Sequence, residues 1–316
     1  MAAPSGYSED EFISLWERLG SATLVAKEMG IAIRNVMARR RAVEQRRGIV
    51  LHSSPVSEIK EMVFLEEHIE EGVVLVASDL HCWPGVETTA QKAFLWAIYE
   101  LEPSVIVLNG DVFDGTQVSR FGANERNKLP TVAKELEACR EYLWYIREAA
   151  PEGCRLVWVM GNHDQRFVRK LIEGAGEYDG IPGFDIRDHF PDWELCYRFT
   201  INPNDTGMTD FVHNWAGGIH AAYNNTLRAG CNYVTGHTHR LMDRPWNDRT
   251  GRRYGIETGT LTDTDGPQSY YVAGRPVDWG SGFPVLTFNN SVLLRPEYVD
   301  VVDEGVFAFR SECYSI

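Results

Sequence analysis

The sequence has no long apolar run and no paired cysteine motif. None of its hydrophobic stretches approaches the roughly 18 residues that a membrane-spanning helix needs, so we expect no membrane insertion. The six cysteines are scattered without any Cys-x-x-Cys pair, which argues against a disulfide framework and a zinc knuckle. We expect them to be free and mostly buried. The first ten residues lack the basic and apolar regions of a signal peptide, which predicts a cytoplasmic protein.

Charge is unevenly distributed along the chain. The 316 residues carry a net charge of −14, yet residues 1–48 contain eight Lys and Arg against six Asp and Glu. A basic head on an acidic body predicts that the head has a partner of its own. Residues 49–60, with three serines and a proline, have linker composition. We therefore divide the chain into a helical domain at 1–48, a linker at 49–60 and a large domain at 61–316.

The head is predicted to form three short helices. Apolar residues recur at helical spacing over 9–20, 22–29 and 33–46. The spacing of Ala26 and Gly30 resembles the helix-turn-helix pattern, although Arg39 stands where an apolar residue is usual. The resemblance implies DNA binding by the third helix, and the alternative is a small helical cap with a solvated basic face. The candidate DNA contacts are Arg34, Arg39, Arg40 and Arg41.

The large domain repeats one arrangement, in which an apolar strand ends and metal-capable side chains follow at once. We interpret its first two apolar stretches, 62–65 and 73–77, as a β-hairpin. Predicted helices at 89–101 and 131–149 separate several of the strands that follow. This alternation predicts a layered α/β domain. The strands that precede the polar clusters end near Ala77, Leu108, Met160, Val212 and Thr235.

Seven side chains in these clusters are possible metal ligands. One such cluster alone is an ordinary turn, but five in succession after strands indicate a shared site. Carboxylate, amide and imidazole ligands without cysteine predict two divalent cations, and we expect Mn²⁺ before Fe, Zn²⁺, Ni²⁺ or Mg²⁺. His213 is chosen over His220 because it directly follows an apolar pair. The seven residues are Asp79, His81, Asp111, Asn162, His213, His237 and His239.

The order of these motifs resembles the calcineurin-like metallophosphoesterase superfamily. Asp-x-His, Gly-Asp-x-x-Asp, Gly-Asn-His-Asp, a single His and Gly-His-x-His occur in that order between Asp79 and His239. The resemblance implies a layered α/β fold of two β-sheets flanked by helices, and attack on phosphorus by a hydroxide that bridges two metals. It also implies that Asp111 bridges the metals. The first metal would be held by Asp79, His81 and His239, and the second by Asn162, His213 and His237.

The same resemblance implies that His163 faces the substrate and is not a ligand. It would protonate the leaving oxygen or stabilise charge on the phosphoryl group. Asp114 and Asp164 are candidates for orienting His163 or the ligands, with turn or helix-cap bonding as the alternative. No protein nucleophile is required, so we expect no covalent phosphoenzyme.

These motifs identify the type of reaction more specifically than they identify the substrate. Their wording is similar to nuclease subunits of the Mre11/SbcD type, and it departs from Ser/Thr protein phosphatases because Cys82 follows His81 and Asp164 replaces a glutamate. With the basic head, this predicts a nuclease acting on DNA. The alternatives are a nucleotide or small-molecule phosphoesterase whose head serves assembly, and a DNA-binding regulator with a structural metal site. A homodimer is compatible with a helix-turn-helix head, but no residue pattern specifies the oligomeric state. The candidate substrate contacts are Arg120, Arg166, Trp215 and Arg240.

Overall fold

The computed structural model describes residues 7–19, 22–51, 63–119, 129–178, 180–272 and 276–316. The chain divides into two units, Met1–Met62 and Val63–Ile316. Residues 52–60, most of the expected linker, lie outside the described residues.

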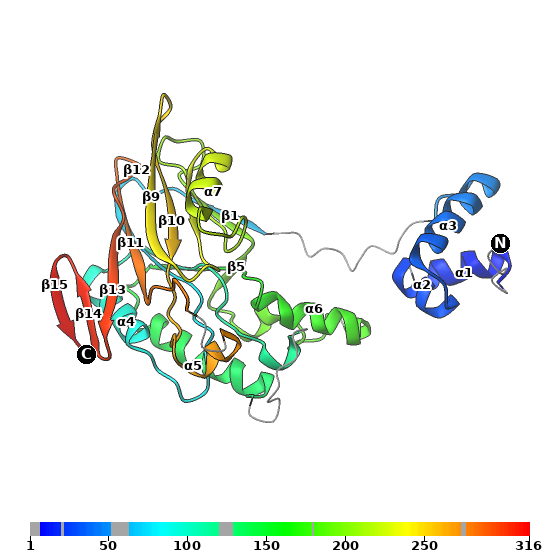
Figure 1. Cartoon of the computed structure of the whole chain (residues 1–316), viewed down its shortest axis with the longest axis horizontal. Helices are drawn as coiled ribbons and strands as arrows, with labels where there is room; N and C mark the ends of the chain where they lie inside the picture. Colours follow the sequence, from blue (N-terminus) through cyan, green and yellow to red (C-terminus); the bar gives the residue numbers. More distant parts are fainter. Residues whose placement is uncertain (1–6, 20–21, 52–62, 120–128, 179, 273–275) are drawn as a thin grey trace. The chain divides into compact units, whose positions relative to one another are not determined.

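Three helices make up the described part of the N-terminal unit: α1 (Glu9–Leu19), α2 (Ala22–Met29) and α3 (Ile33–Arg47) (Figure 1). Gly30 has a φ of +64°, a left-handed conformation that glycine adopts without strain at the turn between α2 and α3. Leu51 joins the core of this unit, so its packing continues past Gly48. The core consists of Phe12, Leu15, Trp16, Val25, Ala26, Val36, Val43 and Leu51.

The second unit contains two β-sheets. In the six-stranded sheet the order is β1-β6-β7-β8-β10-β9, and β7, β8 and β10 run parallel. Its strands are β1 (Phe64–Glu67), β6 (Arg198–Ile201), β7 (Thr209–Phe211), β8 (Asn232–Thr235), β9 (Leu241–Asp248) and β10 (Gly251–Thr258).

In the nine-stranded sheet the order is β15-β14-β13-β11-β2-β3-β4-β5, and β12 pairs with β11. Strands β2 to β5 form a parallel block, and the other pairs are antiparallel. Its strands are β2 (Gly72–Ala77), β3 (Val105–Leu108), β4 (Arg155–Val159), β5 (Glu194–Cys196), β11 (Gly282–Asn289), β12 (Val292–Leu293), β13 (Glu297–Asp303), β14 (Val306–Phe309) and β15 (Glu312–Ser315).

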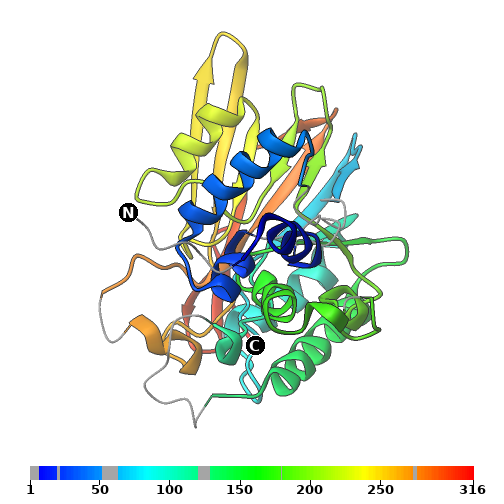
Figure 2. The ribbon, with the colours of Figure 1, turned by 90° about the vertical axis from the view of Figure 1, so that its right-hand side faces the viewer.

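Helices cover the outer faces of the sheets, and the two inner faces pack together. Helix α4 (Thr89–Leu101) packs on β2, β11 and β13 and on α5 (Val132–Ala149), whereas α7 (Ala221–Ala229) packs on β8, β9 and β10 (Figures 1 and 2). Within β2, Val74 and Val76 join the core between the sheets, while Leu75 and Ala77 join the core under the helices. This alternation follows from the two-residue period of a strand. The layered α/β prediction is therefore confirmed.

One prediction about connectivity is wrong. The first two strands do not form a β-hairpin, because β1 pairs in parallel with β6 while β2 pairs with β3 and β11 in the other sheet. Both segments are short and apolar, and such a pattern identifies a strand without identifying its partner. The two strands instead belong to different sheets.

Two predictions of absence can be compared with the structure. All six cysteines are free, and Cys82, Cys139, Cys196 and Cys231 are buried. Among the described residues, no helix is both long enough and apolar enough to cross a bilayer.

Candidate metal centre

The carboxyl ends of parallel strands from both sheets bring the expected ligands together. Asp79, Asp111 and Asn162 come just after β2, β3 and β4, which are neighbours in one sheet. His213 and His237 come just after β7 and β8, which are neighbours in the other. Turns at this edge therefore carry side chains that are far apart in sequence into one region.

Hydrogen bonds connect the two sheets at the same edge. The hydroxyl of Ser78, after β2, lies 2.5 Å from the hydroxyl of Thr258 at the end of β10. Nδ2 of Asn109, after β3, donates to the carbonyl of Val234 in β8 at 3.3 Å. These contacts fix the positions of the ligand-bearing turns of one sheet relative to those of the other sheet.

The backbone is strained at five of the seven expected ligands. They have left-handed φ angles, between 41° and 68°, a region that residues other than glycine adopt at a cost of roughly 1–3 kcal/mol each. Such strain persists only where the surrounding structure enforces it, and it gathers at functional sites. The five residues are Asp79 (51°), His81 (41°), Asp111 (54°), His237 (68°) and His239 (58°).

Two glycines allow the closest approaches in this region. A Cβ atom on Gly161 would lie 2.1 Å from Oδ1 of Asp111 and 2.3 Å from its backbone nitrogen. A Cβ atom on Gly110 would lie 2.3 Å from Nδ1 of His213. Both glycines are therefore required for the packing of side chains against the turns, and Gly110, with a φ of +91°, is required for the turn as well.

Six of the seven expected ligands assemble into two groups. Possible donor atoms of Asp79, His81 and His239 lie within 4.8 Å of one another, and so do those of Asp111, His213 and His237. Oδ2 of Asp111 is 3.1 Å from Nε2 of His213. His213, and not His220, joins the site, because His220 is exposed at the start of α7.

Unpartnered atoms show that these residues fit divalent cations. Nε2 of His81 and Oδ1 of Asn162 are buried and have no hydrogen-bond partner in the described chain, and Nε2 of His213 is buried without a hydrogen bond although Oδ2 of Asp111 lies 3.1 Å from it. Burying such atoms is unfavourable unless something binds them. The opposite ring nitrogens are occupied, since Nδ1 of His81 lies 3.2 Å from Oδ1 of Asp114 and Nδ1 of His213 lies 2.7 Å from the carbonyl of Asn109. Metal-binding histidines have this arrangement, in which one nitrogen is anchored and the other is directed at the ion.

The electrostatics of the two groups agree with this interpretation. Burial would raise the pKa of Asp79, but His239 and His213 lower it to about 2. Burial would lower the pKa of His81 and of His213, but neighbouring carboxylates, chiefly Asp114 and Asp111 respectively, raise them to about 9 and about 10. The carboxylates thus attract protons to the imidazoles where cations would bind. Metal binding is expected to displace these protons.

His163 lies beside both groups in a chain of hydrogen bonds. Its Nδ1 is 2.6 Å from Oδ1 of Asp114, and Nη2 of Arg166 donates to its Nε2 at 2.7 Å. Because a guanidinium can only donate, Nε2 is the acceptor and Nδ1 carries the proton that is donated to Asp114. Burial would raise the pKa of Asp114, but His163 and His81 hold it well below its usual range.

Asp164 has a different role in the geometry. Its buried carboxylate accepts hydrogen bonds from the backbone nitrogens of Asp111 (2.9 Å), Phe113 (2.9 Å) and Gly161 (2.7 Å), and from Nε1 of Trp158 (3.1 Å). This is turn bonding, the alternative that the sequence left open. Asp164 joins the turn after β3 to the turn after β4.

The four candidate substrate contacts occupy different environments. Arg166 contacts His163, and Trp215 is exposed with its ring 5.4 Å from that of Tyr233. Arg240 donates to the buried carboxylate of Glu257 at 2.7 Å and to the carbonyl of Gly218 at 2.5 Å. Arg120 lies outside the described residues.

Trp279 was not singled out from the sequence, although its ring lies 4.4 Å from that of His239. A single tryptophan after a proline-containing loop has no motif that reveals such a contact. The structure therefore adds one aromatic neighbour to the expected ligands.

The basic residues of α3 divide into two kinds. The guanidinium of Arg39 donates to the carbonyl of Tyr7 and lies 5.2 Å from the ring centre of Phe12. Arg40 pairs with Glu44 at 2.9 Å and lies 4.7 Å from the ring centre of Trp16. These contacts explain why an arginine occupies position 39.

Arg34 and Arg41 differ from these two arginines. Both are exposed, and neither has a hydrogen-bond or ion-pair partner among the residues that the structure describes. Of the four candidate DNA contacts, these two are therefore available at the surface.

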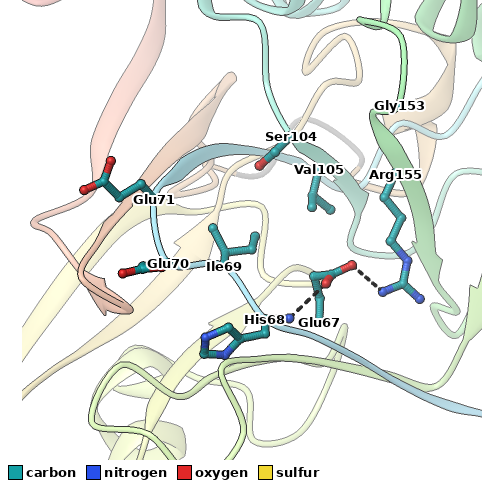
Figure 3. Close-up of a pocket in the computed structure, with 9 residues that line it drawn as sticks. All are labelled: Glu67, His68, Ile69, Glu70, Glu71, Ser104, Val105, Gly153 and Arg155. Carbon is teal, nitrogen blue, oxygen red and sulfur yellow. Dashed lines mark hydrogen bonds and ion pairs between the residues drawn. The ribbon is translucent and has the colours of Figure 1, made fainter.

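A cavity of about 680 Å³ lies at the opposite, amino-terminal ends of the parallel strands (Figure 3). Its basic side chains already face carboxylates: Arg155 pairs with Glu67 at 2.9 Å, and Nδ1 of His68 is 3.7 Å from Asp205. Glu70 and Glu71 add further negative charge, so this cavity does not suit a phosphoester. Its lining consists of Glu67, His68, Ile69, Glu70, Glu71, Ser104, Val105, Gly153 and Arg155.

Comparisons with known proteins agree with the geometry. Residues 72–254 match the family described as calcineurin-like phosphoesterase. The chain is 26% identical over 259 residues to the Gene 54 protein of Mycobacterium phage L5, a match that covers 72% of this chain and 93% of that protein. The donor set and the family together indicate a binuclear site for divalent cations.

Two solved structures are also similar to this chain. Vacuolar protein sorting 29 from Cryptosporidium parvum is 14% identical with a TM-score of 0.42, and the match covers 78% of this chain and 100% of that one. The phosphoesterase YfcE from E. coli is 15% identical with a TM-score of 0.35, and the match covers 71% of this chain and 97% of that one.

Proposed function

Because the chain belongs to the calcineurin-like phosphoesterase family, we propose that this metal-dependent hydrolase cleaves phosphodiester bonds in DNA and that its N-terminal unit binds the DNA. The observation that carries the proposal is the hydrogen-bonded pair of His163 and Asp114 beside two groups of metal-ligating side chains. A site that only bound metal for stability would not need this additional histidine.

The chain's own residues have distinct tasks in this reaction. Bound divalent cations supply a water that ionises near neutral pH and neutralise charge on the phosphate. Asp79, His81 and His239 would hold one cation, and Asn162, His213 and His237 the other, with Asp111 shared between them.

His163 is placed to give a proton to the leaving oxygen from Nε2. Asp114 fixes the ring through Nδ1 and stabilises the imidazolium. Nε2 accepts from Arg166 in this structure, so a substrate phosphate that pairs with the guanidinium would free this nitrogen to take a proton from water, and this is the proton that it then gives to the leaving oxygen. Arg166 is thereby a phosphate contact as well as a neighbour of His163.

The choice of DNA rests on α3. Arg34 and Arg41 are seven residues apart, about two helical turns, so they lie on one side of the helix. Both are exposed and available to phosphates or to guanine edges. Because Arg39 and Arg40 contact other residues of the N-terminal unit, two of the four candidate arginines remain available. That restriction favours a second candidate, a hydrolase of nucleotides or other small phosphoesters whose N-terminal unit serves assembly.

A comparison of substrates separates the two candidates. With Mn²⁺, the full chain should nick supercoiled plasmid and hydrolyse bis-p-nitrophenyl phosphate faster than p-nitrophenyl phosphate. The double variant Arg34→Ala/Arg41→Ala should nick plasmid about tenfold more slowly at moderate salt, because it loses two phosphate contacts, and should hydrolyse the small diester normally.

The matched control removes the same charge from another exposed surface. Arg228→Ala/Arg249→Ala should leave both activities unchanged, because these arginines lie on α7 and at the turn between β9 and β10. Equal loss of both activities in the Arg34/Arg41 variant, or absence of plasmid nicking by the unaltered chain, would refute DNA as the substrate.

A further inference from the structure

The segment from Asp111 to Thr116 is held by carboxylates from two helices. It carries the expected bridging ligand and, three residues later, the partner of His163. Asp164, at the start of α6 (Asp164–Ala175), accepts from the backbone nitrogens of Asp111 and Phe113. The other half of the segment, at Gly115 and Thr116, depends on a second carboxylate that no sequence motif marks.

That second carboxylate belongs to Glu135 of α5. It accepts from the backbone nitrogen of Gly115 at 2.9 Å, from that of Thr116 at 3.2 Å, and from the hydroxyl of Thr116. The side chain is completely buried, with an exposed fraction of 0%. Burial raises its pKa to about 7, although the hydrogen bond from Thr116 opposes this and the charge of Asp114 adds to it.

The burial of a carboxylate at this position requires a physical explanation. The neighbouring buried positions of α5 are mostly apolar, such as Leu136, Leu143 and Ile146, so an apolar residue would suit the core equally well. Removing a carboxylate from water costs several kcal/mol unless hydrogen bonds compensate. Glu135 directs all three of its hydrogen bonds to the two residues that follow Asp114.

The backbone and the side chain of Asp114 are both held by hydrogen bonds, which leaves this turn little conformational freedom. Its carbonyl accepts from Nη1 of Arg166 at 2.8 Å, while its carboxylate contacts His163 and His81. Gly115 has a φ of +65°, and a Cβ atom there would lie 2.9 Å from the ring of Phe113. A shift of the backbone at Gly115 is therefore transmitted to the carboxylate of Asp114.

We propose that Glu135 is a positioning residue for hydrolysis, which holds Asp114 at hydrogen-bonding distance from His163 by binding the backbone of Gly115 and Thr116. The inference rests on the proposed phosphoester hydrolysis at this centre, and it does not depend on DNA as the substrate. The hydrogen bonds of Glu135 within the described chain go to Gly115 and Thr116 and not to an expected ligand, so it acts through Asp114.

The test uses Glu135→Gln in the full chain at pH 8, above the pKa of about 7 so that the Glu135 carboxylate is ionised, with bis-p-nitrophenyl phosphate and saturating Mn²⁺. The glutamine keeps the shape, but its amide nitrogen faces donors and cannot accept from them. We expect kcat at saturating Mn²⁺ to fall about 10- to 100-fold, the scale of a misplaced catalytic group, with KM unchanged. In an Asp114→Asn background the same change should have no further effect on kcat, because the residue through which it acts is already disabled.

A matched control is Asp210→Asn. Asp210 is also a nearly buried carboxylate, and it accepts from the hydroxyl of Thr200 at 2.6 Å. Its replacement should lower the thermal midpoint without lowering kcat. Two outcomes would overturn the proposal. One is that Glu135→Gln lowers kcat equally in the unaltered chain and in the Asp114→Asn background. The other is that Glu135→Gln lowers only the thermal midpoint.

A second measurement does not require turnover. In protein loaded with Zn²⁺, the Nδ1–H resonance of His163, identified by its loss in His163→Ala, should shift in Glu135→Gln and stay in place in Asp210→Asn. An unchanged resonance in Glu135→Gln would refute the positioning role. A shifted resonance in a protein that hydrolyses no phosphoester would refute the proposed function, and with it a role of Glu135 in hydrolysis, while showing that Glu135 positions the Asp114–His163 pair.

Discussion

Nδ1 of His163 lies 2.6 Å from Oδ1 of Asp114, although the two residues are separated by 49 positions in the sequence. They come from the turns that follow β3 and β4, which are parallel neighbours. The same carboxylate oxygen lies 3.2 Å from Nδ1 of His81. One oxygen of Asp114 therefore orients both the proposed proton donor and an expected metal ligand.

Replacement of Asp114 by asparagine should impair both of these histidines. Asparagine offers no negative charge to stabilise the imidazolium of His163, so we expect kcat at saturating Mn²⁺ to fall on the order of 10²-fold or more. Metal affinity should fall about 10- to 100-fold, because His81 loses its anchor. Metal titration followed by kinetics at saturation separates these effects. An unchanged kcat at saturating metal would contradict the orienting role.

His163→Ala and Asn162→Ala should differ although the residues are adjacent. Loss of His163 should lower turnover about 10²- to 10⁴-fold while both metals remain bound, because its ring is not expected to be a ligand. Loss of Asn162 should weaken one of the two metals, because its buried Oδ1 has no other partner in the described chain. Metal analysis after dialysis measures the difference. Metal loss in the His163 variant would contradict this division of roles.

Gly161→Ala should disrupt the centre by steric overlap. The added methyl group would lie 2.1 Å from a carboxylate oxygen of Asp111, so the turn after β4 must move. We expect a loss of about 1–3 kcal/mol in the free energy of unfolding, together with weaker metal binding. Gly174→Ala is the matched control, because that glycine lies in α6 and the new methyl group would have no described atom within 4 Å apart from its chain neighbours and the backbone of its own helix. The control should be neutral or slightly stabilising in thermal unfolding.

The pH dependence of stability should reveal Glu135. Its pKa is about 7 in the folded chain, above the ordinary value of 4.5. The folded state therefore keeps a proton that the unfolded state has released. The resulting stabilisation is complete below pH 4.5 and is lost as pH rises through 7, at no more than about 1.4 kcal/mol per pH unit. Denaturant unfolding between pH 5 and 8 should show this slope in the unaltered chain relative to Glu135→Gln. If the free energy of unfolding had the same pH dependence in both proteins, the raised pKa of Glu135 would be contradicted.

Arg240→Ala should affect stability more than substrate binding. Its guanidinium pairs at 2.7 Å with Glu257, whose side chain is fully buried. Removing the arginine leaves that charge unpaired, which costs about 3–5 kcal/mol. The double variant Arg240→Ala/Glu257→Gln should recover part of the thermal midpoint, because the uncompensated charge is gone. A normal midpoint combined with a raised KM would instead support the substrate contact suggested by the sequence.

Much of the architecture could be predicted because it is encoded locally. The apolar periodicity over 89–101 and 131–149 corresponds to α4 and α5, and the runs ending near Ala77, Leu108 and Thr235 correspond to β2, β3 and β8. Each polar cluster directly follows its strand, so its place at a strand end was visible in a few consecutive residues. Asp79, Asp111 and His213 could be identified in this way.

The choice of strand partners and of side-chain partners could not be predicted, because it depends on contacts between distant segments. A short apolar strand such as β1 has the same pattern whether it pairs with β2 or β6. Arg39 has the same local sequence whether it faces solvent or lies on the ring of Phe12. Glu135, in turn, resembles any acidic residue of an amphipathic helix.

The sequence by itself determined the types of the expected ligands, their order and their positions after strands, because motif and strand adjoin each other in the chain. Only the tertiary structure decided that Asp164 and Glu135 hold opposite halves of the segment around Asp114. The physical reason is burial: a carboxylate becomes a fixed acceptor for particular backbone groups only after packing has removed it from water and left those groups as its partners.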